Sequence, residues 1–174
     1  MNGKQSILNI AKTTITTESK AIANLANLLT DDFADAIQLI YNSKGRVIIT
    51  GIGKSAIIAN KIVATLNSTG TPAVFMHAAD AIHGDLGLIL KDDVVVCISK
   101  SGNTPEIKVL VQLIKNGPNS MIAITANEES FLGKQADYVL NSYVEKEACP
   151  NNLAPTTSTT AQLVVGDAMA VCLL

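Results

Sequence analysis

The chain has 174 residues, of which 48% are hydrophobic, 16% are charged and only 3% are aromatic. This length fits one domain with one core, and the hydrophobic content excludes a disordered chain. The net charge of −2, with no basic run, excludes the usual footprint of a nucleic-acid-binding protein. We also see no signal-peptide or membrane-spanning pattern, and the three cysteines form no CxxC pair. We therefore expect a cytoplasmic protein with neither nucleic acid nor membrane as a partner.

The first quarter of the chain is predicted to be helical. Apolar residues recur there at helical spacing, so we expect N-terminal helices over about residues 3–43. Asp31 or Asp32 is predicted to cap the second of these helices, and Gly45 is predicted to end it.

Short β-branched runs then alternate with helical patterns. The predicted strands are Arg46–Thr50, Ala73–Met76, Asp93–Ile98, Ser120–Thr125 and a short fifth near Tyr138–Leu140. The last segment, from about Ser158, is apolar nearly all round and is predicted to be a buried helix. This alternation predicts an α/β fold with a parallel sheet. Ligands of such sheets bind beyond the carboxyl ends of the strands, where the informative loops of this chain also lie.

The first informative loop is Thr50–Ser55, with the sequence TGIGKS. Its glycines allow close approach of a ligand, the following helix start favours an anion, and Lys54 adds a cation. A Walker A loop is excluded because Ile48 stands where its first glycine is required. A dinucleotide-binding GxGxxA pattern starts at Gly51, but Met76 and His77 stand after the next strand, where its acidic residue is expected. Alternatively, the loop is only a tight turn with a solvated lysine and binds no ligand.

The second loop, Ser99–Thr104, has the sequence SKSGNT and follows the strongest strand pattern. Its hydroxyls and backbone N–H groups could wrap a phosphate without any cationic side chain. Alternatively, Thr104 is an ordinary helix cap, with Pro105 at the first helical position. One cap needs only one hydroxyl, however, and the loop supplies three. Glu106 either complements the helix dipole or faces a ligand pocket.

Three further stretches carry reactive side chains. Met76–Leu88 contains both histidines and two aspartates, but their spacing does not support a metal site, and we predict none. Glu145–Pro150 is a carboxylate pair before a proline, and Ala154–Thr160 is a run of hydroxyls. Taken singly, Glu145–Pro150 would be a solvated turn, and Ala154–Thr160 would be a helix cap with more hydroxyls than a cap needs.

Taken together, the motifs GIGKS, HGDLG, SKSGNTPEI, KEACP and LAPTTSTT resemble, in order and spacing, the sugar isomerase (SIS) domain family. More narrowly, they are similar to its D-arabinose 5-phosphate isomerases, which supply the precursor of 3-deoxy-D-manno-octulosonate (Kdo). The resemblance covers residues 45–174, and HGDLG and KEACP with LAPTTSTT are specific to the isomerase branch.

The resemblance implies a single SIS domain over residues 1–174, which we expect to be truncated at its C-terminus. The chain departs from many members in lacking their paired CBS modules, so we expect no control through them. It implies a flavodoxin-like, three-layer αβα sandwich with a five-stranded parallel sheet. It also implies a homotetramer with sites between subunits, and a sugar nucleotide such as CMP-Kdo as a feedback ligand. A further catalytic histidine, in a His-Pro-Gly-Gly segment, is expected after Leu174.

The resemblance also assigns the site residues. The predicted catalytic residues are Lys54, His83, Glu106 and Glu147. The predicted phosphate ligands are Ser55, Ser99, Ser101 and Thr104. The remaining predicted substrate-binding residues are Gly53, Gly102, Asn103, Thr156 and Ser158.

The implied reaction interconverts D-arabinose 5-phosphate and D-ribulose 5-phosphate through an enediol, for lipopolysaccharide or capsule synthesis. It needs a base near a carbon-bound proton and donors near the developing oxyanion, but neither a cofactor nor a metal. A glutamate suits the base role if burial raises its pKa toward neutrality. We therefore expect Glu147 or the histidine after Leu174 to carry the proton, with Glu106 and Lys54 polarising the sugar oxygens. A sugar-phosphate sensor without catalysis, and an SIS isomerase of another sugar phosphate, are the alternatives.

Overall fold

The computed structural model describes residues 3–174, so residues 1–2 of the predicted single domain lie outside it. It contains a five-stranded, all-parallel sheet with the strand order β2-β1-β3-β4-β5. The strands are β1 (Val47–Gly51), β2 (Ala73–His77), β3 (Val94–Ile98), β4 (Met121–Thr125) and β5 (Tyr138–Asn141). The predicted α/β class and all five predicted strands are therefore confirmed.

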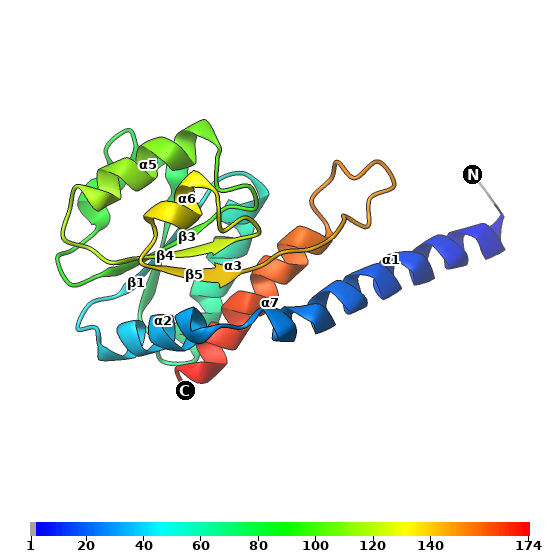
Figure 1. The fold of residues 1–174 in the computed structure, drawn as a ribbon, viewed down its shortest axis with the longest axis horizontal. Helices are drawn as coiled ribbons and strands as arrows, with labels where there is room; N and C mark the ends of the chain where they lie inside the picture. The colour runs from blue at the N-terminus through cyan, green and yellow to red at the C-terminus, as the bar shows by residue number, and fades with distance from the viewer. Residues whose placement is uncertain (1–2) are drawn as a thin grey trace.

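Helices cover both faces of the sheet, which completes the expected three-layer sandwich (Figure 1). The longer helices are α1 (Lys4–Leu25), α2 (Asp31–Asn42), α3 (Lys54–Ser68), α5 (Pro105–Lys115) and α7 (Thr157–Cys172). The shorter ones are α4 (Ala78–Ala81), α6 (Phe131–Gln135) and the 3-10 turns η1 (Ala26–Leu28) and η2 (Asp85–Leu88). One face of the sheet packs against α2, α3 and α7, and the other against α4, α5 and α6.

The core is aliphatic, as the lack of aromatics requires. Alternate residues of each strand point to opposite faces, so Ile49 packs toward α3 and α7 while Ile48 packs toward α5. Both side chains are fully buried, and each such burial stabilises the fold by about 1.5–3 kcal/mol. The prediction that the last segment is a buried helix is confirmed. Gly166 lies against Ile62, and a side chain at this position would collide with Ile62, so α3 and α7 pack at close range.

The beginning and end of α2 differ from the prediction. Thr30, not Asp31 or Asp32, occupies the capping position, and no side chain caps the helix. Instead, Asp32 Oδ2 accepts a hydrogen bond from the Val139 N–H at 3.0 Å, because β5 is an edge strand with unpaired backbone groups. The helix ends at Asn42, before Gly45. A side chain at Gly45 would collide with the backbone of Asp92.

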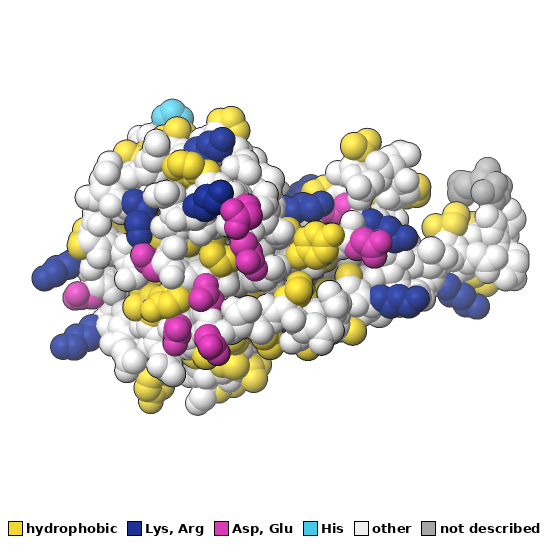
Figure 2. Space-filling model, in the orientation of Figure 1, with side chains coloured by type: hydrophobic (Ala, Val, Ile, Leu, Met, Phe, Trp, Pro, Cys, Tyr) yellow, Lys and Arg dark blue, Asp and Glu magenta, His cyan; other side chains and the backbone are white. Residues whose placement is uncertain are grey.

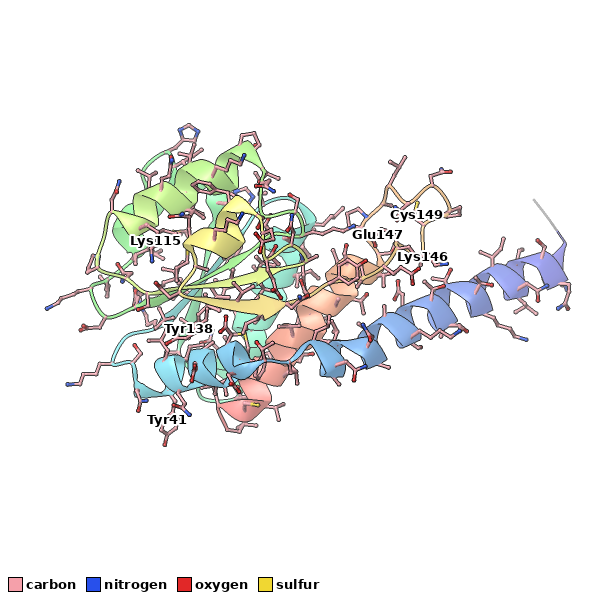
Figure 3. The ribbon with its side chains drawn as sticks, viewed as in Figure 1. Tyr41, Lys115, Tyr138, Lys146, Glu147 and Cys149 are labelled. Atoms are coloured by element: carbon pink, nitrogen blue, oxygen red, sulfur yellow. The ribbon has the colours of Figure 1, made fainter. Side chains whose placement is uncertain are left out.

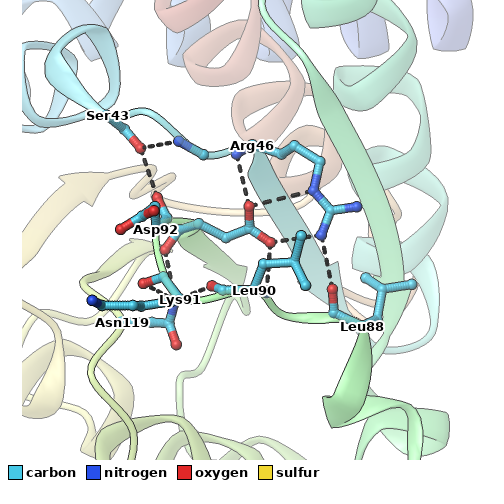
Figure 4. Close-up of polar contacts among 9 residues, drawn as sticks. Ser43, Arg46, Leu88, Leu90, Lys91, Asp92 and Asn119 are labelled. Atoms are coloured by element: carbon cyan, nitrogen blue, oxygen red, sulfur yellow. Dashed lines mark hydrogen bonds and ion pairs between the residues drawn. The ribbon is translucent and has the colours of Figure 1, made fainter.

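At the amino edge of the sheet, a buried carboxylate ties several loops together (Figure 4). Asp93 Oδ2 accepts from Arg46 Nη2 at 2.7 Å and from the Leu90 N–H at 2.8 Å. Asp93 Oδ1 accepts from the Arg46 N–H at 2.8 Å, and Arg46 Nη2 also donates to the Leu88 carbonyl. Burial by itself would raise the pKa of Asp93, but the hydrogen bonds from Arg46 and Leu90 outweigh it and lower the pKa.

The first helix stands away from the body of the domain and contacts it mainly through α7 (Figures 1 and 2). Its exposed apolar residues include Ile7, Ile10 and Ile15. Within residues 3–174, no helix combines the length and the hydropathy that crossing a bilayer requires.

Candidate active site

A cavity of about 280 Å³ lies at the carboxyl edge of the sheet. The pairing of Gly51 with Ile98 places the loops after β1 and β3 side by side there. This is the switch point at which the strand order reverses, where doubly wound sheets bind ligands. The cavity is lined by Ile52, Lys54, Ser55, Ser99, Lys100, Ser101, Thr104, Pro155, Ser158, Thr159 and Gln162.

The loop between β3 and α5 folds so that its hydroxyls support its own backbone. Ser99 Oγ accepts a hydrogen bond from the Gly102 N–H at 3.1 Å, and Ser101 Oγ accepts from the Asn103 N–H at 3.3 Å. Each hydroxyl still has a proton to donate, because both act here as acceptors. Gly102 has a φ of +64°, and any side chain at Gly102 would collide with Ser130. Glycine is therefore required for this turn.

Thr104 does not act as the helix cap that the sequence allowed. It occupies the capping position of α5 but makes no side-chain capping bond. Its Oγ1 atom is buried without a hydrogen-bond partner among the described residues, and Thr104 lines the cavity. A buried unpaired hydroxyl costs free energy unless water or a ligand pairs with it. The α5 N-terminus adds the partial positive charge that favours an anion at the same point.

Gly102 and Asn103 contact the short helix α6. Asn103 Oδ1 accepts from the Phe131 N–H at 3.0 Å, and the Gly102 carbonyl accepts from the Leu132 N–H at 3.1 Å. Both residues therefore dock the short helix α6 against the loop. Neither lines the cavity.

The loop between β1 and α3 contributes one fixed and one free side chain. Gly53 has a φ of +58°, which a residue with a side chain rarely adopts. Ser55 Oγ donates to Gln162 Oε1 at 3.1 Å, and Gln162 is almost fully buried in α7. Lys54, the first residue of α3, is exposed and has no ion-pair partner within residues 3–174.

Glu147 lies on the loop between β5 and α7 (Figure 3), yet only 4% of it is exposed. Its carboxylate accepts five hydrogen bonds, from Lys100 Nζ and from the backbone N–H and hydroxyl groups of Thr156 and Ser158. The N–H groups of Thr156 and Ser158 belong to the start of α7. Glu147 therefore caps α7 from outside, and the hydroxyl run does not cap its own helix in the expected way.

These contacts lower the pKa of Glu147 and favour its ionised form. Burial by itself would raise the pKa of the carboxyl group, but the hydrogen bonds from Lys100, Ser158 and the Thr156 N–H lower it to about 2. The condition for a glutamate base, a pKa raised toward neutrality by burial, is therefore not met at Glu147, because donors surround the buried carboxylate. A carboxylate with such a low pKa is a poor proton acceptor near neutral pH.

The structure brings six of the predicted site residues to the cavity wall, namely Lys54, Ser55, Ser99, Ser101, Thr104 and Ser158. Glu147 and Thr156 lie directly behind Ser158. The other predicted residues lie outside the lining, among them the exposed His83 and the partly exposed Glu106 in the first turn of α5.

Sequence reasoning missed Lys100 and Gln162. Lys100 stands between two predicted phosphate ligands, and this position could have identified it. Gln162 lies four residues after Ser158, on the same face of a mostly apolar helix, which is also a readable signal. Ile52, Pro155 and Thr159 complete the wall that the sequence did not predict.

Metal-ligating and thiol groups are scattered. The described part of the chain holds no cluster of three or more His, Cys, Asp or Glu side chains able to bind a metal ion. All three cysteines are free, and burial raises the pKa of the Cys97 thiol to about 12.

Comparison with known proteins identifies the family. The SIS domain family matches residues 39–172. The chain belongs to the SIS domain family. This SIS domain is 49% identical over 176 residues to the arabinose 5-phosphate isomerase KdsD of Pseudomonas aeruginosa, covering 100% of the chain and 54% of that protein. It is 47% identical over 169 residues to KpsF, named arabinose 5-phosphate isomerase, of Escherichia coli O6:H1, covering 97% of the chain and 52% of that protein.

The SIS domain thus spans about half the length of the curated relatives it matches. Its fold is also similar to the solved structure of E. coli CFT073 c3406 in complex with arabinose 5-phosphate, with a TM-score of 0.94 and 40% identity. That match covers 99% of the chain and 92% of the solved chain. The expected family and the expected fold are therefore confirmed.

Proposed function

We propose that this SIS domain interconverts D-arabinose 5-phosphate and D-ribulose 5-phosphate through an enediol. The observation that carries the proposal is the 40% identity, over 99% of the chain, to a solved structure in complex with arabinose 5-phosphate. The curated relatives named arabinose 5-phosphate isomerase support the same reaction and, through it, a place in Kdo synthesis.

The phosphate of the substrate is proposed to bind to Ser99, Ser101 and Thr104, with Ser55 on the opposite wall. The Thr104 hydroxyl, unpaired within residues 3–174, and the free protons of the two serine hydroxyls support this placement. The remaining hydroxyls of the sugar are assigned to Ser158 and, through the resemblance alone, to Gly53, Gly102, Asn103 and Thr156.

The isomerisation moves a proton between neighbouring carbons, so no electrons enter or leave and no cofactor is required. Lys54 is proposed to stabilise the charge that develops on the sugar oxygen, because it places a cation at the cavity wall. With its low pKa, Glu147 suits a fixed negative charge that orients Ser158 and Lys100. Proton transfer is therefore assigned to Glu106, with His83 as a further catalytic candidate.

The proposed assembly is a cytoplasmic homotetramer that CMP-Kdo inhibits. The exposed apolar residues of α1 support association between copies. Light scattering after size-exclusion chromatography tests the tetramer, and a monomer at working concentration would contradict it. CMP-Kdo rests on the resemblance alone, and unchanged turnover at millimolar CMP-Kdo would exclude it.

The decisive experiment is a coupled assay of the purified protein with arabinose 5-phosphate, ribose 5-phosphate and glucose 6-phosphate. We expect conversion of arabinose 5-phosphate only. Binding without conversion of any sugar would favour a sensor. Preferred conversion of another sugar phosphate would favour a different SIS isomerase.

A further inference from the structure

Lys100 has a fixed backbone at the mouth of the cavity. Its carbonyl oxygen accepts hydrogen bonds from the Ala126 N–H at 3.1 Å and from Thr125 Oγ1 at 3.3 Å. These bonds hold the main chain of Lys100 against the end of β4. The residue therefore stays between Ser99 and Ser101, and it lines the same cavity.

The side chain of Lys100 reaches from this loop to the start of α7. Its Nζ lies 2.6 Å from Glu147 Oε1, and 46% of the Lys100 side chain is exposed while only 1% of the Glu147 side chain is. An ammonium group has three N–H donors, and Glu147 is the one polar partner of Nζ among residues 3–174. The Lys100 ammonium therefore has further N–H donors available on the solvent side of its ion pair with the buried Glu147.

The charges around the cavity indicate that the free N–H groups of Lys100 can bind an anion. A sugar phosphate carries up to two negative charges, whereas the hydroxyls of Ser99, Ser101 and Thr104 carry none. The ionised Glu147 lies behind the cavity wall and would repel a phosphate held there, as like charges at short range do. Lys100 bonds to Glu147 and lines the cavity, so its ammonium can offset this repulsion and bind the phosphate.

We propose that Lys100 is a phosphate-binding residue of this site, whose ammonium group contacts the substrate phosphate and is held in position by Glu147. The inference rests on the proposed function only for the identity of the ligand as a sugar phosphate. It adds a cation to a loop whose hydroxyls and backbone N–H groups were expected to bind the anion.

The test compares Lys100→Met, which keeps most of the length of the side chain but removes its charge, with Lys100→Arg, which keeps the charge. Lys108→Met is the matched control, because Lys108 is exposed on α5 and does not line the cavity. For each protein we would measure the KM for arabinose 5-phosphate, kcat, and the inhibition constants of inorganic phosphate and of arabinose, which lacks the phosphate.

Lys100→Met is expected to raise the KM and the phosphate inhibition constant about 10- to 100-fold, as loss of a charged hydrogen bond does. Its kcat and its inhibition constant for arabinose should change by less than about threefold. Lys100→Arg should recover most of the loss, and Lys108→Met should match the wild type. A merely structural role would weaken phosphate and arabinose alike.

Two results would overturn the proposal. One is an unchanged phosphate inhibition constant in Lys100→Met, and the other is a fall in kcat with KM unchanged. Either result leaves the isomerase function intact as long as the wild type converts arabinose 5-phosphate. Conversely, calorimetry could show Lys100-dependent binding of inorganic phosphate in a protein that isomerises nothing, which would support Lys100 and reject the isomerase.

Discussion

Two buried carboxylates, Asp93 and Glu147, lie at opposite edges of the sheet. Each accepts hydrogen bonds from a basic side chain and from backbone N–H groups, and each has a lowered pKa despite its burial. At both edges, an ionised acceptor joins loops that are far apart in the sequence. The two sites share a buried, ionised carboxylate but differ in the groups that surround it.

At the amino edge, the basic partner is bound several times over. Arg46 contacts Asp93 through its backbone and its guanidinium group, and it also donates to the Leu88 carbonyl. At the carboxyl edge, the Lys100 ammonium has a single polar partner among the described residues and lines a cavity beside the unpaired Thr104 hydroxyl. The comparison shows that a buried carboxylate can fix its basic partner fully at one edge and leave a cation at a cavity wall at the other.

The largest expected effect concerns chemistry at the carboxyl edge. If Glu106 takes part in proton transfer, Glu106→Gln should lower kcat about 100- to 10,000-fold with little change in the unfolding temperature. Glu129→Gln is the control, because Glu129 is highly exposed and pairs with Lys134 at the surface. Normal turnover of Glu106→Gln in the coupled assay would remove Glu106 from the mechanism.

A stability effect is expected at the amino edge. Asp93→Ala removes the acceptor of the Arg46 guanidinium and of two backbone N–H groups. We expect the free energy of unfolding to fall by about 3–4 kcal/mol, as when one partner of a buried pair is removed. Chemical denaturation measures the loss. A stable variant with impaired substrate binding would contradict the division of roles between the two edges.

Acid should weaken the carboxyl edge through Glu147. Its pKa is about 2 in the folded state, below the ordinary value of 4.5. The ionised form therefore stabilises the fold above about pH 4.5, and this contribution is lost as the pH falls toward 2. The loss should be on the order of 2–3 kcal/mol.

Denaturation of the wild type and Glu147→Gln between about pH 7 and pH 2 checks this prediction. The variant should be less stable near neutral pH and should lose less stability on acidification. Asp93 also has a lowered pKa, but it is present in both proteins and so cancels in the comparison. Parallel pH profiles would show that Glu147 does not stabilise the fold through its charge.

The smallest effect concerns the turn of the loop between β3 and α5. Gly102→Ala places a side chain at a φ of +64° and against Ser130, so we expect a loss of about 1–3 kcal/mol in the free energy of unfolding. Gly87→Ala is the matched control, because Gly87 has open space around it and no positive φ. Equal stability of the two variants would mean that the loop can readjust.

Much of the fold and part of the site follow from the sequence by itself. Buried parallel strands consist of β-branched runs, so β3 and its neighbours were readable within one residue at each end. The hydroxyls of Ser99, Ser101 and Thr104 fall within six residues after a strand, so their gathering needs only local geometry. Helices as short as α4 and α6 carry too few residues to show a period and were missed.

The tertiary structure alone decided which distant groups meet. Lys100 and Glu147 are 47 residues apart, and Ser55 and Gln162 are 107 apart, so no local pattern pairs them. The ionisation of Glu147 depends on the donors that converge on it, and a sequence shows that a glutamate is present but not how many N–H groups face it. Types of residue and their local spacing determine the elements and the candidate loops, whereas charge state and pairing depend on contacts that only the folded chain creates.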